Sequence, residues 1–279
     1  MFRTIVSVEE LAEHIGDRGW VVIDCRHSLQ DHGAGGRAYG EGHIPGAFFA
    51  NVETDLAGKK TGKNGRHPLP DPHELAAFLA ELGVTPQTQI VAYDAGADMF
   101  AARLWFLCKY IGHDSVAVLN GGFAAWTSAG KPVETKEPAR PKTGTIAPQP
   151  RRELTADADA VLESLETKEL VLLDARAADR FAGQNETIDR VAGHIPGALN
   201  RPFKTNFNER GMFKSPEELR AEYAQLGVEP RRLVHQCGSG VSSAVNLLAM
   251  EIAGVEGSRL YPGSWSEWIA DPARPIATG

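Results

Sequence analysis

The sequence predicts an α/β protein with two tandem domains, each built on a parallel sheet that is flanked by helices on both faces. Two observations lead to this prediction. Short apolar runs alternate with segments of helical periodicity along the chain, and one order of runs and motifs occurs twice. With 279 residues, the chain is long enough for two domains of ordinary size, each with its own core.

The repeat begins with a strand-like run and a fixed motif. Residues 21–49 and residues 171–199 each start with an apolar run that ends in an aspartate, and each continues to the motif GHIPGA. The histidines of the two motifs, His43 and His194, are 151 residues apart. The same strand, loop and motif therefore occur once in each half of the chain.

The later parts of the two copies also align. Residues 90–107 match residues 233–250 at an offset of 143, so the second copy is shorter between its motifs. A period of roughly 145 residues is too long for a solenoid and indicates duplicated domains. We expect a first domain at residues 1–140, a proline-rich extended linker at 141–152 and a second domain at 153–279.

The elements of each copy follow from local signals. Ser7 and Glu10 form the pattern of a capping box at a helix start. Ser215 and Glu218 repeat that pattern in the second half, and Asp71 precedes a proline in a third helix start. The expected strands are residues 21–23, 47–51, 89–92 and 116–119 in the first copy, and 170–173, 198–200, 232–235 and 258–260 in the second.

Composition excludes several classes of protein. The net charge of -7 without a basic cluster argues against nucleic-acid binding. The N-terminal residues lack the basic-then-apolar pattern of a secretory signal, and no run approaches the roughly 18 apolar residues of a membrane span. Three cysteines without CxxC spacing argue against a disulfide framework or a zinc site. We expect a cytoplasmic protein without cofactor or metal.

The stretch VHQCGSGVSSA places Cys237 between an expected strand and a helix that begins near Ser242. In parallel sheets, ligands bind at this carboxyl end of the strands. Gly238 and Gly240 allow backbone angles that bring successive amides together, and the helix N-terminus adds partial positive charge. Such surroundings favour a thiolate and lower the pKa of a cysteine from about 8.5. Cys237 is therefore predicted to be a reactive nucleophile.

The other two cysteines lack this setting. Cys25 follows a strand end without flanking glycines, and Cys108 lies on the apolar face of an expected helix, so both are predicted to be core residues. The first copy carries Asp94 at the position of Cys237. An aspartate offers no nucleophilic sulfur, so the first domain is expected to be non-catalytic.

Five further residues have structural or site roles that the sequence indicates. Asp24 and Asp174 end their strands and are expected to pair with the backbone of the following loops. Trp265 and Trp268 are expected to pack under the final turn. His67, in the segment GRHPLP, is a candidate for lining the substrate site.

These motifs together resemble those of the two-domain rhodanese family, which includes the thiosulfate and 3-mercaptopyruvate sulfurtransferases. The resemblance covers nearly the whole chain and includes the tandem copies, GHIPGA, the glycine loop after Cys237 and a late Gly-x-x-x-x-Trp turn. It implies a two-step sulfur transfer through a Cys237 persulfide. The implied partners are a small-molecule sulfur donor and an acceptor such as cyanide, a small thiol or thioredoxin.

The loop after the cysteine indicates the donor. Thiosulfate enzymes of the family carry basic side chains where this chain has Gly238 and Ser239. The sequence therefore resembles the mercaptopyruvate type, with Ser242 in place of the usual threonine. The resemblance implies that Gly238, Gly240, Val241 and Ser242 contact the donor. Thiosulfate as the main donor stays open as the alternative.

The resemblance also suggests residues outside the loop. Arginines upstream of the second GHIPGA hold the donor carboxylate, which a forked guanidinium suits, and Arg180 and Arg190 match them. Ser239 is expected to act on the donor carbonyl or on the departing enolate. In the mercaptopyruvate type such a serine is polarised by a histidine and an aspartate of the first domain, for which His43 and Asp31 are the matches.

The sequence also bears on two other functions. The related phosphatases need an arginine six positions after the cysteine, where this chain has Ser243, so phosphate ester turnover is not expected. A non-enzymatic persulfide carrier or docking module stays open as a second alternative.

Overall fold

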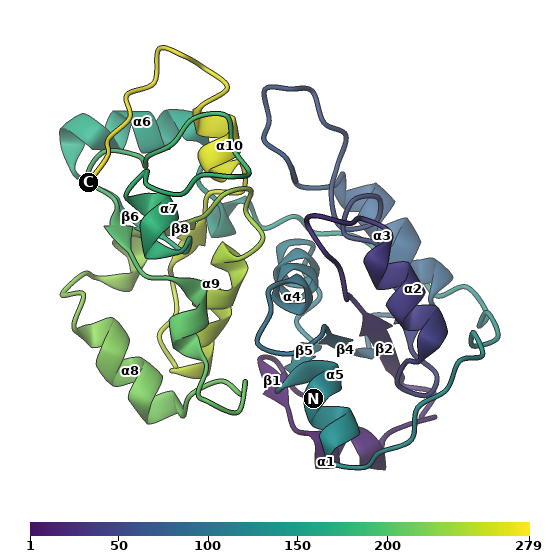
Figure 1. Cartoon of the computed structure of the whole chain (residues 1–279). Helices are drawn as coiled ribbons and strands as arrows, with labels where there is room; N and C mark the ends of the chain where they lie inside the picture. Colours follow the sequence, from purple (N-terminus) through teal and green to yellow (C-terminus); the bar gives the residue numbers. More distant parts are fainter. The chain divides into compact units, whose positions relative to one another are not determined.

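The computed structural model describes all 279 residues, which form two compact units (Figure 1). The units are not contiguous in sequence. The segment Lys59–Pro68 of the first half belongs to unit 2, and the segment Phe207–Phe213 of the second half belongs to unit 1. Unit 1 comprises Met1–Gly58, Leu69–Arg151 and Phe207–Phe213, and unit 2 comprises Lys59–Pro68, Arg152–Asn206 and Lys214–Gly279. No helix combines the length and the apolar character that a membrane span requires.

Unit 1 contains a five-stranded sheet in the order β1-β5-β4-β2-β3, and every neighbouring pair is parallel. Parallel pairing explains the near-continuous apolar runs, because both faces of such a sheet are buried. The strands are β1 (Ile5–Val6), β2 (Trp20–Asp24), β3 (Phe48–Phe49), β4 (Gln89–Tyr93) and β5 (Val116–Leu119).

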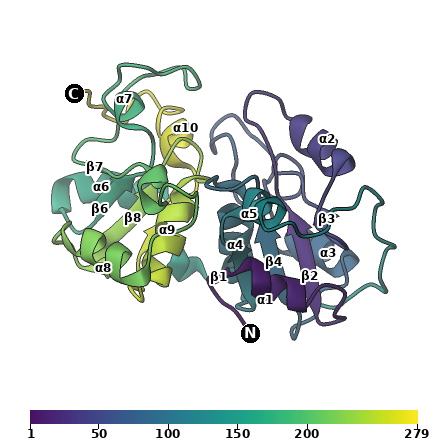
Figure 2. The same ribbon diagram turned by 60° about the horizontal axis from the view of Figure 1, so that its bottom comes forward.

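Helices cover both faces of this sheet (Figures 1 and 2). Val8 and Leu11 of α1 and Trp126 of α5 share one core cluster with strand residues such as Val91. α3 and α4 lie on the opposite face, where α4 contacts β4 and β5. The helices are α1 (Val8–Glu13), α2 (Ala34–Glu41), α3 (Pro72–Glu81), α4 (Phe100–Tyr110) and α5 (Gly122–Ser128).

Unit 2 repeats this plan with a four-stranded parallel sheet in the order β7-β6-β8-β9. α6 and α10 share a core cluster on one face, and α8 and α9 lie on the other. The elements are β6 (Val171–Asp174), β7 (Leu199–Asn200), β8 (Leu233–Gln236), β9 (Arg259–Leu260), α6 (Ala158–Thr167), α7 (Ala178–Phe181), α8 (Pro216–Ala224), α9 (Ser243–Ile252), α10 (Ser264–Trp268), and 3-10 turns at Arg152–Leu154, Phe203–Asn206 and Pro230–Arg232.

The predicted fold class is confirmed, and most predicted element starts are too. Ser7 and Ser215 both form complete capping boxes, and the Asp71 side chain accepts from the amides of His73 and Glu74. Every expected strand region contains a strand, with ends shifted by a few residues. The two-residue strand β1 was not expected.

The strand-end aspartates hold the loops that follow them, as predicted. Asp24 accepts from the backbone amide of Arg26 at 2.9 Å and pairs with its guanidinium, and Asp174 binds Arg176 in the same way. Each arginine also donates to a carbonyl just before the GHIPGA histidine. The two buried ion pairs therefore fix the same loop in both copies.

Candidate functional site

Cys237 lies where β8 ends and is 2% exposed. The backbone amide of Gly240 donates to its sulfur at 3.2 Å, and the Ser243 hydroxyl donates at 3.5 Å. The carbonyls of Cys237 and Gly238 accept from amides of α10, so they face away from the sulfur. This division leaves amides and hydroxyls around the sulfur, at the N-terminal end of α9.

These contacts decide the ionisation of the thiol. Burial alone raises the pKa of Cys237, but hydrogen bonds from the hydroxyls of Ser242 and Ser243 and from the amides of Ser239 and Ser243 oppose it. The net result is a pKa below the ordinary value for cysteine. Hydrogen bonds to the sulfur, rather than a neighbouring base, therefore favour the thiolate form.

Gly240 shapes the loop through its backbone. Its φ of +75° favours glycine, and a Cβ there would lie 2.3 Å from the carbonyl oxygen of Pro262. Because that oxygen belongs to the backbone, the loop has to shift to accept a side chain. Such a shift would move the amide that donates to the sulfur. Val241 and Ser242, which complete the loop, are both buried.

We expect Gly240→Ala to destabilise the protein by about 1–3 kcal/mol and to raise the pKa of Cys237. Gly227→Ala is the matched control, since Gly227 has a φ of +63° but no atom near its missing Cβ. Alkylation rates of Cys237 against pH, together with denaturant melts, measure both effects. An unchanged pKa of Cys237 in Gly240→Ala would show that the Gly240 amide does not stabilise the thiolate.

Ser239 and His67 form a buried pair beside this loop. The Ser239 hydroxyl lies 2.8 Å from Nδ1 of His67, and the two residues are 5% and 3% exposed. Both belong to unit 2, because the segment Lys59–Pro68 packs with the second unit. With Nδ1 as acceptor, the imidazole polarises the hydroxyl.

This finding corrects the expectation for His43 and Asp31. His43 is fully buried in unit 1, where its Nδ1 lies 2.9 Å from the Tyr39 carbonyl and its ring stacks on Tyr39. Asp31 is exposed and pairs with Arg37. The second copy indicates the role of His43, because His194 makes the equivalent carbonyl contact and also stacks on a neighbouring aromatic ring. The GHIPGA histidines thus fix their own loops.

Arg180 lies beside the loop, as the sequence suggested, within a charge network. Its Nε and Nη2 bind Glu186, and Nη2 also reaches Asp189 at 3.2 Å. Arg66 pairs with the same Asp189 through Nη1. A Cβ on Gly238 would meet Nη2 of Arg66 at 2.7 Å and Nη2 of Arg180 at 3.8 Å. Two guanidinium groups therefore flank the residue next to Cys237.

Arg190 is placed elsewhere. Its Nη2 donates to the carbonyl of Ile269 at 2.6 Å, just after α10. This contact ties the loop before GHIPGA to the end of α10. The position of a second guanidinium near the cysteine loop is taken by Arg66, which the sequence reasoning did not identify.

Arg66 and His67 share one signal that the sequence did contain. Both lie in the interval where the first copy is longer, by 151 minus 143, or eight residues. The ten-residue segment Lys59–Pro68 falls in that interval and belongs to unit 2. An insertion that carries adjacent arginine and histidine residues is the feature that could have drawn attention to them.

The loop after β4 in the first copy has the same backbone arrangement as the loop around Cys237, with a different side chain. Asp94 follows β4 and accepts from the amides of Gly96 and Ala101, each at 3.0 Å. Its carbonyl accepts from the amide of Phe123, as that of Cys237 accepts from Trp265. Burial raises the pKa of the Asp94 carboxyl, while the amide donors act in the opposite direction. A carboxyl group thus occupies the place of the nucleophile in unit 1.

The remaining sulfur and aromatic residues are structural, as predicted. Cys25 and Cys108 are fully buried, and burial raises the pKa of both thiols. Trp265 and Trp268 are also fully buried, and their indole nitrogens donate to the carbonyls of Val191 and Pro275. Only Cys237 among the three cysteines has a lowered pKa.

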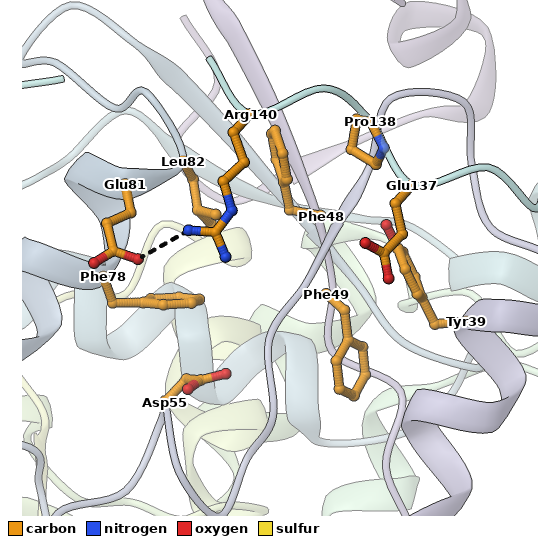
Figure 3. Close-up of a pocket in the computed structure, with 10 residues that line it drawn as sticks. All are labelled: Tyr39, Phe48, Phe49, Asp55, Phe78, Glu81, Leu82, Glu137, Pro138 and Arg140. Carbon is orange, nitrogen blue, oxygen red and sulfur yellow. Dashed lines mark ion pairs between the residues drawn. The ribbon is translucent and has the colours of Figure 1, made fainter. Parts of the chain in front are cut away.

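Unit 1 also contains a cavity of about 350 Å³ that no predicted site residue lines (Figure 3). Aromatic rings and carboxylates surround it, and Arg140 at its rim pairs with Glu81 at 3.8 Å. The lining residues are Tyr39, Phe48, Phe49, Asp55, Phe78, Glu81, Leu82, Glu137, Pro138 and Arg140. The cavity contains no cysteine, so it offers no sulfur nucleophile.

Comparison with known proteins agrees with this geometry. The model of the rhodanese-like domain matches residues 7–129 and again residues 157–271. A Pseudomonas aeruginosa protein named a probable 3-mercaptopyruvate sulfurtransferase is 45% identical over 279 residues, covering 99% of this chain and 98% of that protein. A Mycobacterium tuberculosis protein named putative thiosulfate sulfurtransferase SseB is 37% identical, with 99% and 98% covered.

A solved structure gives the same result in three dimensions. The crystal structure of SseA from Escherichia coli, described as a 3-mercaptopyruvate sulfotransferase, matches with a TM-score of 0.82 and 32% identity. The match covers 95% of this chain and 99% of that one. With two matched domains and relatives aligned over nearly their full length, the chain belongs to the rhodanese family of sulfurtransferases.

Proposed function

We propose that the protein moves a sulfane sulfur from 3-mercaptopyruvate, through a persulfide on Cys237, to a thiol or cyanide acceptor. This proposal rests on two features that lie together in the loop after Cys237. A buried sulfur has a lowered pKa, and a serine polarised by His67 lies two residues further on. The names of the relatives support the same donor class.

In the first half-reaction, the Cys237 thiolate attacks the thiol sulfur of the donor. A sulfur–sulfur bond forms and the carbon–sulfur bond breaks, so its electron pair becomes the enolate of pyruvate. The proton on the transferred sulfur is released and the enolate takes up a proton, which gives pyruvate and a persulfide anion. The amides and hydroxyls that hold the thiolate suit this anion as well.

Ser239 is the residue suited to the enolate. It is buried, and its hydroxyl is held by the His67 ring at 2.8 Å. During turnover, once Nδ1 carries a proton and donates to the hydroxyl oxygen, the hydroxyl can donate its own proton to the developing enolate and take up a replacement from the imidazole. Thiosulfate releases sulfite, which requires no carbon protonation. The pair therefore favours mercaptopyruvate over thiosulfate.

The donor carboxylate is proposed to bind Arg66 and Arg180. Asp189 and Glu186 already neutralise much of the positive charge of these two guanidinium groups. The site therefore suits a donor with one carboxylate better than a doubly charged donor. The contacts of Arg180 with these acids use Nε and Nη2, which leaves Nη1 for the donor. Arg66 presents Nη2 toward Gly238.

We expect Arg66→Ala and Arg180→Ala each to raise the KM for mercaptopyruvate about 10–100-fold, the equivalent of one charge-assisted hydrogen bond. Arg232→Ala is the matched control, because that guanidinium binds backbone carbonyls at residues 168 and 169. Steady-state kinetics with a fixed thiol acceptor measure the effect. A loss of kcat with unchanged KM would show that the arginines do not hold the donor.

In the second half-reaction, a thiolate or cyanide attacks the outer sulfur of the persulfide and restores the Cys237 thiolate. A small thiol or thioredoxin would serve as acceptor. All three cysteines are free and buried. An enzyme that works through a free thiolate suits a reducing compartment, so we propose a cytoplasmic setting.

Two measurements on the purified protein test the proposal. Mass spectrometry after treatment with donor alone should show one added sulfur on the Cys237 peptide, and kcat/KM should be higher for mercaptopyruvate than for thiosulfate. A higher value for thiosulfate would establish the alternative donor. Persulfide formation without turnover to any small acceptor would favour a carrier or docking module. Absence of added sulfur would overturn the proposal.

A further inference from the structure

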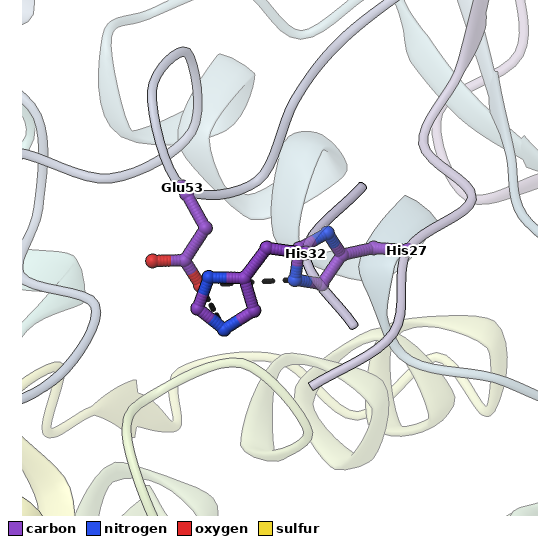
Figure 4. A group of neighbouring side chains, drawn as sticks. All are labelled: His27, His32 and Glu53. Atoms are coloured by element: carbon purple, nitrogen blue, oxygen red, sulfur yellow. Dashed lines mark ion pairs between the residues drawn. The ribbon is translucent and has the colours of Figure 1, made fainter. Parts of the chain in front are cut away.

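Unit 1 brings together two histidines and a glutamate that the sulfur chemistry does not use (Figure 4). His27 follows β2, Glu53 follows β3, and His32 lies in the loop before α2. β2 and β3 are parallel neighbours, so their carboxyl ends meet at one edge of the sheet. Side chains from both loops therefore converge there, where parallel sheets bind ligands.

The distances suit a metal ion better than direct hydrogen bonds. Nε2 of His27 lies 3.7 Å from Oε1 of Glu53, and Nε2 of His32 lies 3.9 Å from the same oxygen. One donor atom from each residue lies within 4.8 Å of the other two. Tetrahedral zinc with bonds of about 2.0–2.1 Å requires donor separations of roughly 3.3 Å. Closure by about half an ångström would bring each histidine nitrogen to that distance from Glu53, while the two histidine donor atoms, up to 4.8 Å apart, would have to approach each other by up to about 1.5 Å.

The local structure permits this closure. The His27 side chain is buried and packs edge-on against Phe100 at 5.1 Å, which fixes one ligand. The Glu53 amide donates to the Asn51 side chain at 2.9 Å, which holds the backbone of the second. His32 is 58% exposed and can move toward them. One buried ligand, one ligand on a held backbone and one movable ligand provide a partly preformed site.

The second copy shows that the fold itself does not require this cluster. Arg26 and Arg176 make the same contacts 150 residues apart, so Ala177 takes the place of His27. The amides of Ala50 and Arg201 both donate to the strand-end aspartate carbonyls, which puts Lys204 at the place of Glu53. Neither Ala177 nor Lys204 provides an imidazole or carboxylate ligand for a metal ion. The ligand set is a property of unit 1 alone.

We propose that His27, His32 and Glu53 form a site for a divalent transition metal, of which zinc fits the donor set best. Two imidazole nitrogens and one carboxylate are the ligands of several zinc and other transition-metal sites, and they leave a fourth position for water. Bound metal would tie the loop after β2 to the loop after β3. This site is independent of the sulfur chemistry and would raise the stability of unit 1.

Cobalt(II) and zinc titrations of the full chain test the site. The Cys237→Ser protein is used, so that the thiolate cannot bind the metal. We expect one cobalt per chain, with the strong visible absorption of tetrahedral coordination and without a thiolate charge-transfer band. Zinc should displace the cobalt and raise the melting temperature.

His32→Ala and Glu53→Gln should each abolish the visible band and weaken zinc binding by more than the roughly 10–100-fold loss typical of an outer-shell change. His14→Ala is the matched control, because His14 pairs with a single carboxylate, Asp17. Metal-free melts of the variants establish that each one folds. Absence of the band in the parent protein, or a band that persists in both ligand variants, would overturn the proposal.

Discussion

Replacement of Cys237 by serine should lower sulfur transfer by more than about 1,000-fold with either donor. Serine has almost the same shape but is not ionised near neutral pH, so it cannot form a persulfide. The amide of Gly240 and the hydroxyl of Ser243 remain in place, and the fold should not change. Product formation from mercaptopyruvate and from thiosulfate, with cyanide as a common acceptor, measures the loss.

The other cysteines provide the controls for this variant. Cys25→Ala and Cys108→Ala remove buried thiols whose pKa is raised by burial, so activity should stay within a few-fold of the parent protein. Their cost should appear in thermal stability, because each change leaves a small cavity. Equal losses of transfer in all three variants would mean that another sulfur carries the reaction.

Ser239→Ala should lower turnover with mercaptopyruvate about 100-fold and change turnover with thiosulfate only a few-fold. The reason is that only the mercaptopyruvate reaction leaves an enolate that requires a proton. The hydroxyl lies 2.8 Å from the His67 ring, so His67→Ala should produce the same donor-dependent pattern. The ratio of kcat values for the two donors is the quantity to measure.

A double-mutant cycle separates a joint role from two separate ones. If Ser239 and His67 act as one unit, the double variant should be scarcely slower than either single variant. His73→Ala is the control, since His73 is an exposed residue at the start of α3. An equal loss with both donors would assign Ser239 to the shape of the loop rather than to proton transfer.

Local features of the chain were readable because each depends on a few neighbouring residues. The capping boxes at Ser7 and Ser215, the apolar runs of the strands and the glycines around Cys237 all act over a few positions. Backbone hydrogen bonds and turn conformations are settled at that range. The fold class and the nucleophile candidate could therefore be predicted from the sequence.

The partner of Ser239 could not be predicted in this way. The motif of His43 is prominent and repeated, which favours it in the sequence, yet the repetition reflects a structural role that His194 shares. His67 lies 172 residues before Ser239 and has no counterpart in the second copy. Only the packing of the segment Lys59–Pro68 with unit 2 brings the two side chains together.

One can read from the sequence a duplicated α/β architecture, one activated cysteine at a strand end and an aspartate at the equivalent place in the other copy. These properties follow from patterns and turns that short stretches specify. Packing between distant segments sets which histidine contacts Ser239 and which arginines flank Gly238. These contacts depend on where long connections return to the core. Packing at that place, rather than spacing along the chain, sets the distances between the side chains.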